Sequence, residues 1–197
     1  LVADLDNPGV NPLRLNKILG DLDALSNGQK VILYFHWGME HVWLPPSNDI
    51  ALAKKLLEHD RVLAIIGMHP HRVQGIVEHA GKKAFMSLGN FLFPNFYISP
   101  PVQIFDANES QKAAVKSVTR HYHAVHKLTY KKWCWRNRVS MMLEYCTDSL
   151  DFNFSFVVQD DNQPHVVNLT KAPLILYETW IWFLSQLYRL PTPIYKV

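Results

Sequence analysis

The chain has 197 residues, of which 48% are hydrophobic and 19% are charged. This composition is typical of a folded globular protein and argues against an intrinsically disordered one. The formal net charge of +3 permits contact with anionic partners but does not require a nucleic-acid-binding protein. The two cysteines, Cys134 and Cys146, show neither metal-binding nor framework spacing, so they are either two thiols or one disulfide.

The first third of the chain alternates helical and strand patterns. Apolar residues at helical spacing predict a helix within residues 12–26, and the apolar run 31–35 is typical of a strand buried on both faces. Residues 45–60 predict a loop followed by a helix, and residues 61–67 repeat the buried-strand pattern. A strand, a helix and a strand over this length predict a βαβ unit with two parallel, neighbouring strands.

The rest of the chain predicts further strands and one late helix. Residues 82–93 predict a third short strand that ends in a Ser-Leu-Gly-Asn turn. Three more strands are predicted at residues 138–146, 152–159 and 165–169. Residues 172–190 form the most apolar late segment, but they include an acidic residue. This favours an amphipathic helix packed on the body over a transmembrane span.

Three histidines follow the two predicted parallel strands. His36 directly follows the first strand, His69 follows the second by one residue, and His71 lies beyond Pro70. Neighbouring parallel strands end at one edge of a sheet, where open α/β folds bind their ligands. A single histidine after a strand is commonly a hydrogen-bonded loop residue, but three converging imidazoles predict a site for a divalent transition metal such as manganese, iron or zinc.

Three motifs occur in order along the first half of the chain. They are His-Trp-Gly-x-Glu at residues 36–40, Gly-x-His-Pro-His at 67–71 and Ser-Leu-Gly-Asn-Phe at 87–91. With them, residues 28–93 resemble the bacterial capsule synthesis protein family called CapA. That family is associated with poly-gamma-glutamate capsule production and is similar to the calcineurin-like metallophosphoesterases.

The resemblance implies an α/β fold, a metallophosphoesterase-like α/β/β/α sandwich. The chain, residues 1–197, would be the C-terminal portion of a single domain of this kind. Its motif core would be residues 28–93, followed by the strands and helix of residues 139–190.

The resemblance also implies roles for five residues. His36, His69 and His71 would be the catalytic metal ligands, with His36 and His69 on one ion and His71 on a second. Glu40 and Asn90 would face substrate or support the site by orienting a histidine or a water. The upstream aspartate, acidic partner and Asn-His pair of the family do not occur in residues 1–35, and residue 68 is methionine where many relatives have histidine. A dinuclear site would therefore need the upstream ligands of the family in addition to His36, His69 and His71.

Two functions follow as expectations, and whether the protein is an enzyme stays open between them. The first is capsule or poly-gamma-glutamate biosynthesis with a metallophosphatase-type site that hydrolyses a phosphoester. The alternative is a non-catalytic module that binds an anionic polymer or a membrane synthase. Residues 126–138 interleave basic and aromatic side chains, so charge reversal at Lys131 and Lys132 should weaken polyglutamate binding. Nucleic acid is a minor hypothesis, and the resemblance points to the cell envelope or extracellular face, without an anchor in this chain.

Overall fold

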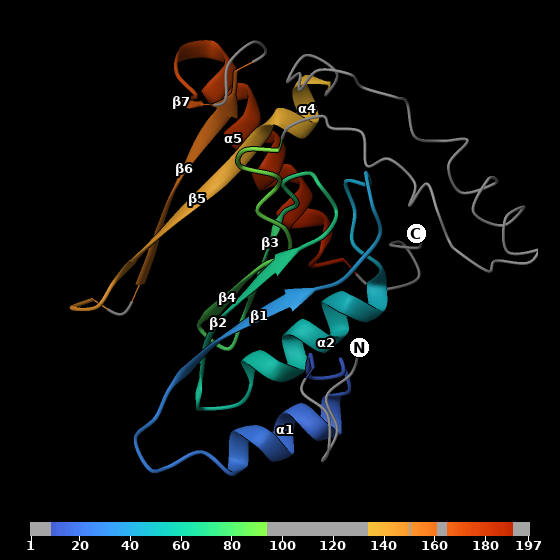
Figure 1. The fold of residues 1–197 in the computed structure, drawn as a ribbon, viewed down its shortest axis with the longest axis vertical. Coiled ribbons are helices and arrows are strands. Elements are labelled where there is room, and N and C mark those ends of the chain that lie inside the picture. The colour runs from blue at the N-terminus through green and yellow to red at the C-terminus, as the bar shows by residue number, and fades with distance from the viewer. Residues whose placement is uncertain (1–8, 94–133, 150, 161–164, 191–197) are drawn as a thin grey trace, which may run out of the picture.

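A computed structural model describes residues 9–93, 134–149, 151–160 and 165–190 (Figure 1). Two β-sheets and several helices make up this part of the chain. The elements, in chain order, are α1 (Leu15–Asp23), β1 (Val31–His36), α2 (Ser47–Leu57), β2 (Val62–Met68), β3 (Ile76–His79), β4 (Lys82–Phe85), α4 (Trp135–Arg138), β5 (Val139–Cys146), β6 (Asp151–Gln159), β7 (Val166–Asn168) and α5 (Lys171–Leu187).

The first sheet has the strand order β1-β2-β4-β3. Strands β1 and β2 are parallel neighbours joined through α2, which confirms the predicted βαβ unit. Strand β4 extends the parallel sheet, and β3 pairs antiparallel with β4. The β3–β4 hairpin was not predicted, because β3 is only four residues long and includes Glu78 and His79. Its turn places Ala80 and Gly81 at positive φ.

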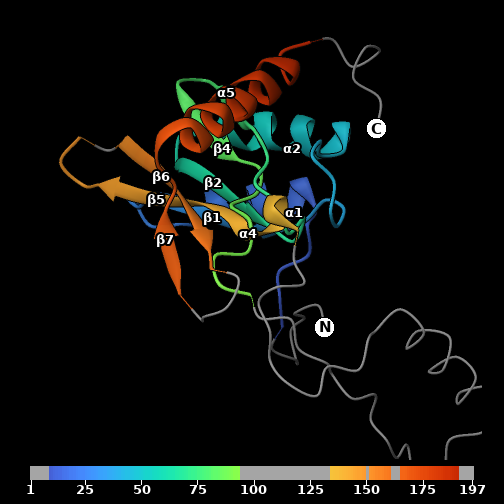
Figure 2. The ribbon, with the colours of Figure 1, turned by 90° about the horizontal axis from the view of Figure 1, so that it is seen from above.

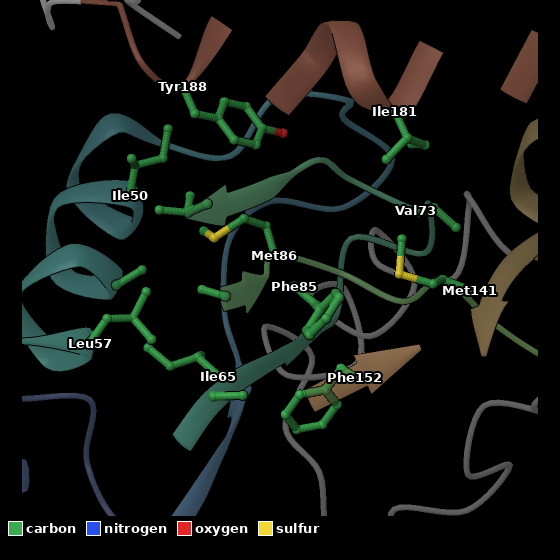
Figure 3. Packing of buried hydrophobic residues seen from close by; sticks show 14 of the residues in the cluster. Ile50, Leu57, Ile65, Val73, Phe85, Met86, Met141, Phe152, Ile181 and Tyr188 are labelled. Atoms are coloured by element: carbon green, nitrogen blue, oxygen red, sulfur yellow. The ribbon is translucent and has the colours of Figure 1, made fainter. Parts of the chain in front are cut away.

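Helix α2 covers one face of this sheet with a regular apolar stripe. Its buried residues recur at helical spacing, and Leu57 lies near Ile65 of β2 (Figure 3). The prediction that β1 is buried on both faces is wrong, because Ile32 and Tyr34 are 38% and 62% exposed. Strand β1 is an edge strand of the first sheet, and the second sheet meets β4 instead.

The second sheet, β5-β6-β7, is antiparallel throughout. Phe85 of β4 and Phe152 of β6 bring the two sheets together, with ring centroids 5.6 Å apart (Figure 3). The Met141 amide also donates a 2.9 Å hydrogen bond to the Leu88 carbonyl. The combination of a parallel core, an antiparallel second sheet and packed helices confirms the expected α/β class.

Helix α5 packs against the first sheet beside β3 and ends near α2 (Figure 2). The Ile76 amide donates to Ser185 Oγ at 2.8 Å, and Lys54 Nζ of α2 donates to the Tyr188 carbonyl at 3.1 Å. Tyr177, Ile181 and Leu184 form the buried stripe of the helix. In the part of the chain that the structure describes, no helix combines the length and apolarity needed to cross a bilayer.

Gly67 of β2 allows a close contact that fixes the chain after β1. The Trp37 indole crosses β2 at this point and donates from Nε1 to the Met86 carbonyl at 2.9 Å. A Cβ on Gly67 would overlap both the Met86 carbonyl oxygen and Trp37 Nε1. The missing side chain therefore lets the indole tie the segment after β1 to the segment after β4.

Gly67→Ala should lower the free energy of unfolding by about 1–3 kcal/mol, because the methyl group displaces a buried hydrogen bond. Urea denaturation followed by circular dichroism measures the change. Gly20→Ala in α1 is the matched control, since its methyl group would meet no atom within 4 Å apart from its chain neighbours and the nearby backbone of its own helix. It should leave stability unchanged or raise it by up to about 1 kcal/mol. Equal urea midpoints for Gly67→Ala and the wild type would contradict this account.

Candidate metal centre

The carboxyl ends of β1 and β2 bring three histidines to one edge of the first sheet. His36 is the last residue of β1, and His69 directly follows β2. The ring centroids of His36 and His69 are 4.4 Å apart, and those of His69 and His71 are 6.3 Å apart. This edge therefore gathers the imidazoles that the sequence placed after the two strands.

The turn that carries His69 and His71 has an unusual backbone. Both residues have positive φ angles, 101° and 55°, which side-chain-bearing residues rarely adopt. The segment after β1 holds this turn, since the His41 amide donates to the Pro70 carbonyl at 2.8 Å and the Trp37 amide donates to the Met68 carbonyl at 3.2 Å. Such conformations cost on the order of 1–3 kcal/mol each and cluster at functional sites, where surrounding contacts maintain them.

Three side chains of this edge could share one metal ion. Glu40, His69 and His71 each offer one donor atom, and these atoms lie within 4.8 Å of one another. Two ligands bonded to a zinc-sized ion are at most about 4.2 Å apart, so small side-chain rotations would close the set. Two imidazoles and a carboxylate form a ligand set known in catalytic zinc sites and also suited to iron or manganese. The residues thus fit a divalent transition metal.

The residues whose donor atoms cluster in the structure are not the same three that the sequence suggested as metal ligands. Glu40, expected to face substrate or support the ligands, belongs to the group of clustered donor atoms. His36, expected as a ligand, is exposed and lies against the His69 ring beside that group. The sequence could not decide between them, because which side chain reaches inward depends on the path of the segment after β1.

Asn90 orients one of the histidines. Its Oδ1 lies 2.6 Å from His71 Nδ1, while its Nδ2 donates to the Asn137 carbonyl at 3.0 Å. Because the second hydrogen bond fixes the amide, Oδ1 is the acceptor and His71 Nδ1 carries the proton. Nε2 of His71 then bears the lone pair that a metal ion requires.

Asn137 is a buried residue of the site that the sequence did not reveal. It is only 4% exposed, and its Nδ2 lies 2.9 Å from His41 Nδ1. Its Oδ1 accepts hydrogen bonds from Arg72 Nε at 3.2 Å and from Cys134 Sγ at 2.9 Å. Asn137 falls in the basic and aromatic stretch 126–138, but nothing in that pattern singles it out. Lys131 and Lys132 of the same stretch lie outside the described residues.

Two ionisable groups near this edge have shifted pKa values. Loss of water around the His41 ring is the main cause that lowers its pKa, and repulsion from the His71 ring, when that ring is protonated, lowers it further. Burial raises the pKa of Asp49, in the first turn of α2. The neutral form of His41 suits its place, since Nδ1 can then accept the hydrogen bond from Asn137 Nδ2.

A comparison with protein families matches the part of the chain that holds Glu40, His69 and His71. Residues 2–95 match the family described as bacterial capsule synthesis protein PGA_cap. The sequence is 29% identical to the capsule biosynthesis protein CapA of Bacillus anthracis over an alignment of 97 residues. This alignment covers 47% of this chain and 23% of the relative. The sequence is also 30% identical to the PGA biosynthesis protein CapA of Bacillus subtilis strain 168 over an alignment of 92 residues. This alignment covers 46% of this chain and 24% of the relative. The match therefore spans about a quarter of each relative.

Asn137→Ala should lower the free energy of unfolding by about 1–3 kcal/mol, because it removes the hydrogen bonds that this buried side chain makes with His41, Arg72 and Cys134. It should also shift the ring ¹⁵N resonances of His41, because Nδ1 of that ring contacts the Asn137 side chain. The His71 resonances should change much less, because Asn90 bonds the backbone carbonyl of residue 137, which the variant keeps. Thermal denaturation and long-range ¹H–¹⁵N spectra measure the two effects.

The control for this variant is Asn153→Ala, an exposed position of β6. It should change neither the melting temperature nor the histidine resonances. Histidine spectra of Asn137→Ala that coincide with those of the wild type would show that Asn137 does not organise the site.

Proposed function

We propose that this protein acts in capsule or poly-gamma-glutamate biosynthesis by hydrolysing a phosphoester at a divalent metal centre. The match of residues 2–95 to the bacterial capsule synthesis protein PGA_cap family supports the biosynthetic part of this proposal. The observation that carries this proposal is the group formed by Glu40, His69 and His71, whose donor atoms lie within 4.8 Å of one another. The same motifs that carry the family match supply these three side chains. The relatives' names extend the proposal to a poly-gamma-glutamate capsule.

The side chains around this group have distinct proposed roles. Glu40, His69 and His71 would hold the ion, which would supply a Lewis acid that activates water and offsets charge on a phosphoryl oxygen. Asn90 keeps the proton on Nδ1 of His71, so that the ring presents Nε2. His36, which is exposed beside His69, would give a proton to the departing oxygen of the ester.

Metal content of single variants tests the ligand assignment. Zinc- or manganese-loaded protein, dialysed and measured by inductively coupled plasma mass spectrometry, should hold about one ion per chain. His69→Ala and Glu40→Ala should each lose most of it, because each removes one of three ligands. His79→Ala is the matched control, since this histidine lies on β3 and pairs with Glu58. A His69→Ala protein with full metal content would contradict the site.

His36→Ala separates the two possible ligand sets. If Glu40 completes the set, this variant should keep its metal and lose at least about tenfold in hydrolysis of bis(p-nitrophenyl) phosphate, because it lacks the proton donor. Loss of metal from His36→Ala together with retention by Glu40→Ala would instead assign the ligand role to His36.

A protein that binds no divalent metal but is retained on a polyglutamate column would contradict the enzyme proposal. It would support the non-catalytic polymer-binding module in its place.

A further inference from the structure

An aromatic pocket adjoins the candidate metal centre. It has a volume of about 520 Å³ and is formed by the segment after β1, by α4 and by α5. We use the name aromatic pocket for the cavity lined by Trp43, Trp135, Arg136, Pro173, Leu176, Tyr177 and Trp180. The rings of Trp43 and Trp180 are nearly perpendicular, with centroids 5.6 Å apart.

Arg72 connects this pocket with the metal centre. It directly follows His71, and its guanidinium carbon lies 5.2 Å from the centroid of the Trp43 ring. Its Nε donates to Asn137 Oδ1, and the same amide contacts His41. A ligand in the aromatic pocket would thus lie next to the turn that carries His69 and His71.

The charge of the pocket indicates an anionic ligand. Arg72 and Arg136 both place their guanidinium groups over Trp43, at 5.2 Å and 5.9 Å from the ring centroid. Among the described residues, the pocket lining contains no acidic side chain. A cationic ligand would be repelled here, whereas a phosphate or carboxylate would be attracted.

Tyr177 supplies a polar group that lacks a partner. Its side chain is 4% exposed, and its hydroxyl has no hydrogen-bond partner among the described residues. Burial raises the pKa of this phenol above its ordinary value, so the hydroxyl remains a donor at neutral pH. Native proteins rarely leave a buried hydroxyl unpaired. Because Tyr177 lines the aromatic pocket, a small rotation of its side chain on ligand binding would let the hydroxyl donate to an acceptor there.

We propose that the aromatic pocket binds the ring-bearing organic group of an anionic phosphoester, either a sugar phosphate or a nucleotide, whose phosphate reaches the adjoining metal centre. This rests on the proposed function. A sugar or base ring packs its flat face on tryptophan and offers acceptors to Tyr177. A plain alkyl chain would remove water from the Arg136 guanidinium group without replacing its hydrogen bonds.

Calorimetric titration of the full chain in EDTA tests the pocket without metal. Glucose 1-phosphate, ribose 5-phosphate and uridine monophosphate are the ring-bearing probes, and glycerol phosphate and inorganic phosphate are the probes without a ring. At least one ring-bearing probe should bind about tenfold more tightly than glycerol phosphate, and the order among the three distinguishes sugar from base. Equal affinity for all probes, or tighter binding of a gamma-glutamyl oligomer, would overturn the proposal.

Two tryptophans of α5 form a matched pair of variants. Trp180 lines the aromatic pocket, whereas Trp182, 63% exposed, lines a separate cavity on the other side of the helix. Trp180→Ala should weaken binding of the preferred probe at least about tenfold, and Trp182→Ala should leave it unchanged. Equal losses in the two variants would overturn the assignment to this pocket.

Tyr177→Phe should lower the affinity for the probe without lowering the stability of the protein. It removes a hydroxyl that has no hydrogen-bond partner among the described residues, so the melting temperature should stay the same or rise. Probe affinity should nevertheless fall about three- to tenfold. Unchanged affinity would show that the hydroxyl does not meet the ligand.

The two proposals fail separately. Selective binding of a ring-bearing probe by a protein that takes up no metal would refute the metal centre and support the pocket. Metal uptake that depends on His69, without any preference for ring-bearing probes, would support the metal centre and refute the pocket.

Discussion

Parallel pairing of β1 with β2 is the constraint on which the candidate site depends. It carries the ends of both strands to one edge and brings His36 and His69 within 4.4 Å, although 32 intervening residues separate them along the chain. Gly67 and the Trp37 indole then fix the segment after β1 against the segment after β4. Without that close approach, Glu40 and Asn90 would have no defined position relative to the His69–His71 turn.

The candidate metal centre and the aromatic pocket share supporting residues. Asn137 holds His41 and Arg72 through its side chain and Asn90 through its carbonyl. Arg72 in turn lies over Trp43 of the pocket. The short helix α4 therefore places one buried amide between the candidate metal centre and the aromatic pocket. This arrangement suits a site that must hold a phosphate and recognise the group attached to it.

Sequence patterns predicted the strands and helices that form from the hydrophobic spacing of neighbouring residues. Apolar runs and helical spacing located β1, α2 and β2, and the shared strand edge followed from their order. The membership of Glu40 in the donor group and the role of Asn137 were out of reach. Asn137 meets His41 across 96 positions and Asn90 across 47, and no short-range pattern reports such contacts. The exposed face of β1 escaped prediction for the same reason, since burial there depends on where the second sheet lies.

Anomalous diffraction from a crystal soaked in zinc or manganese tests the central claim most directly. The account predicts one strong peak about 2.0–2.2 Å from donor atoms of Glu40, His69 and His71. A strong peak elsewhere with none at this edge of the sheet would contradict it, as would side chains that point apart around an empty centre.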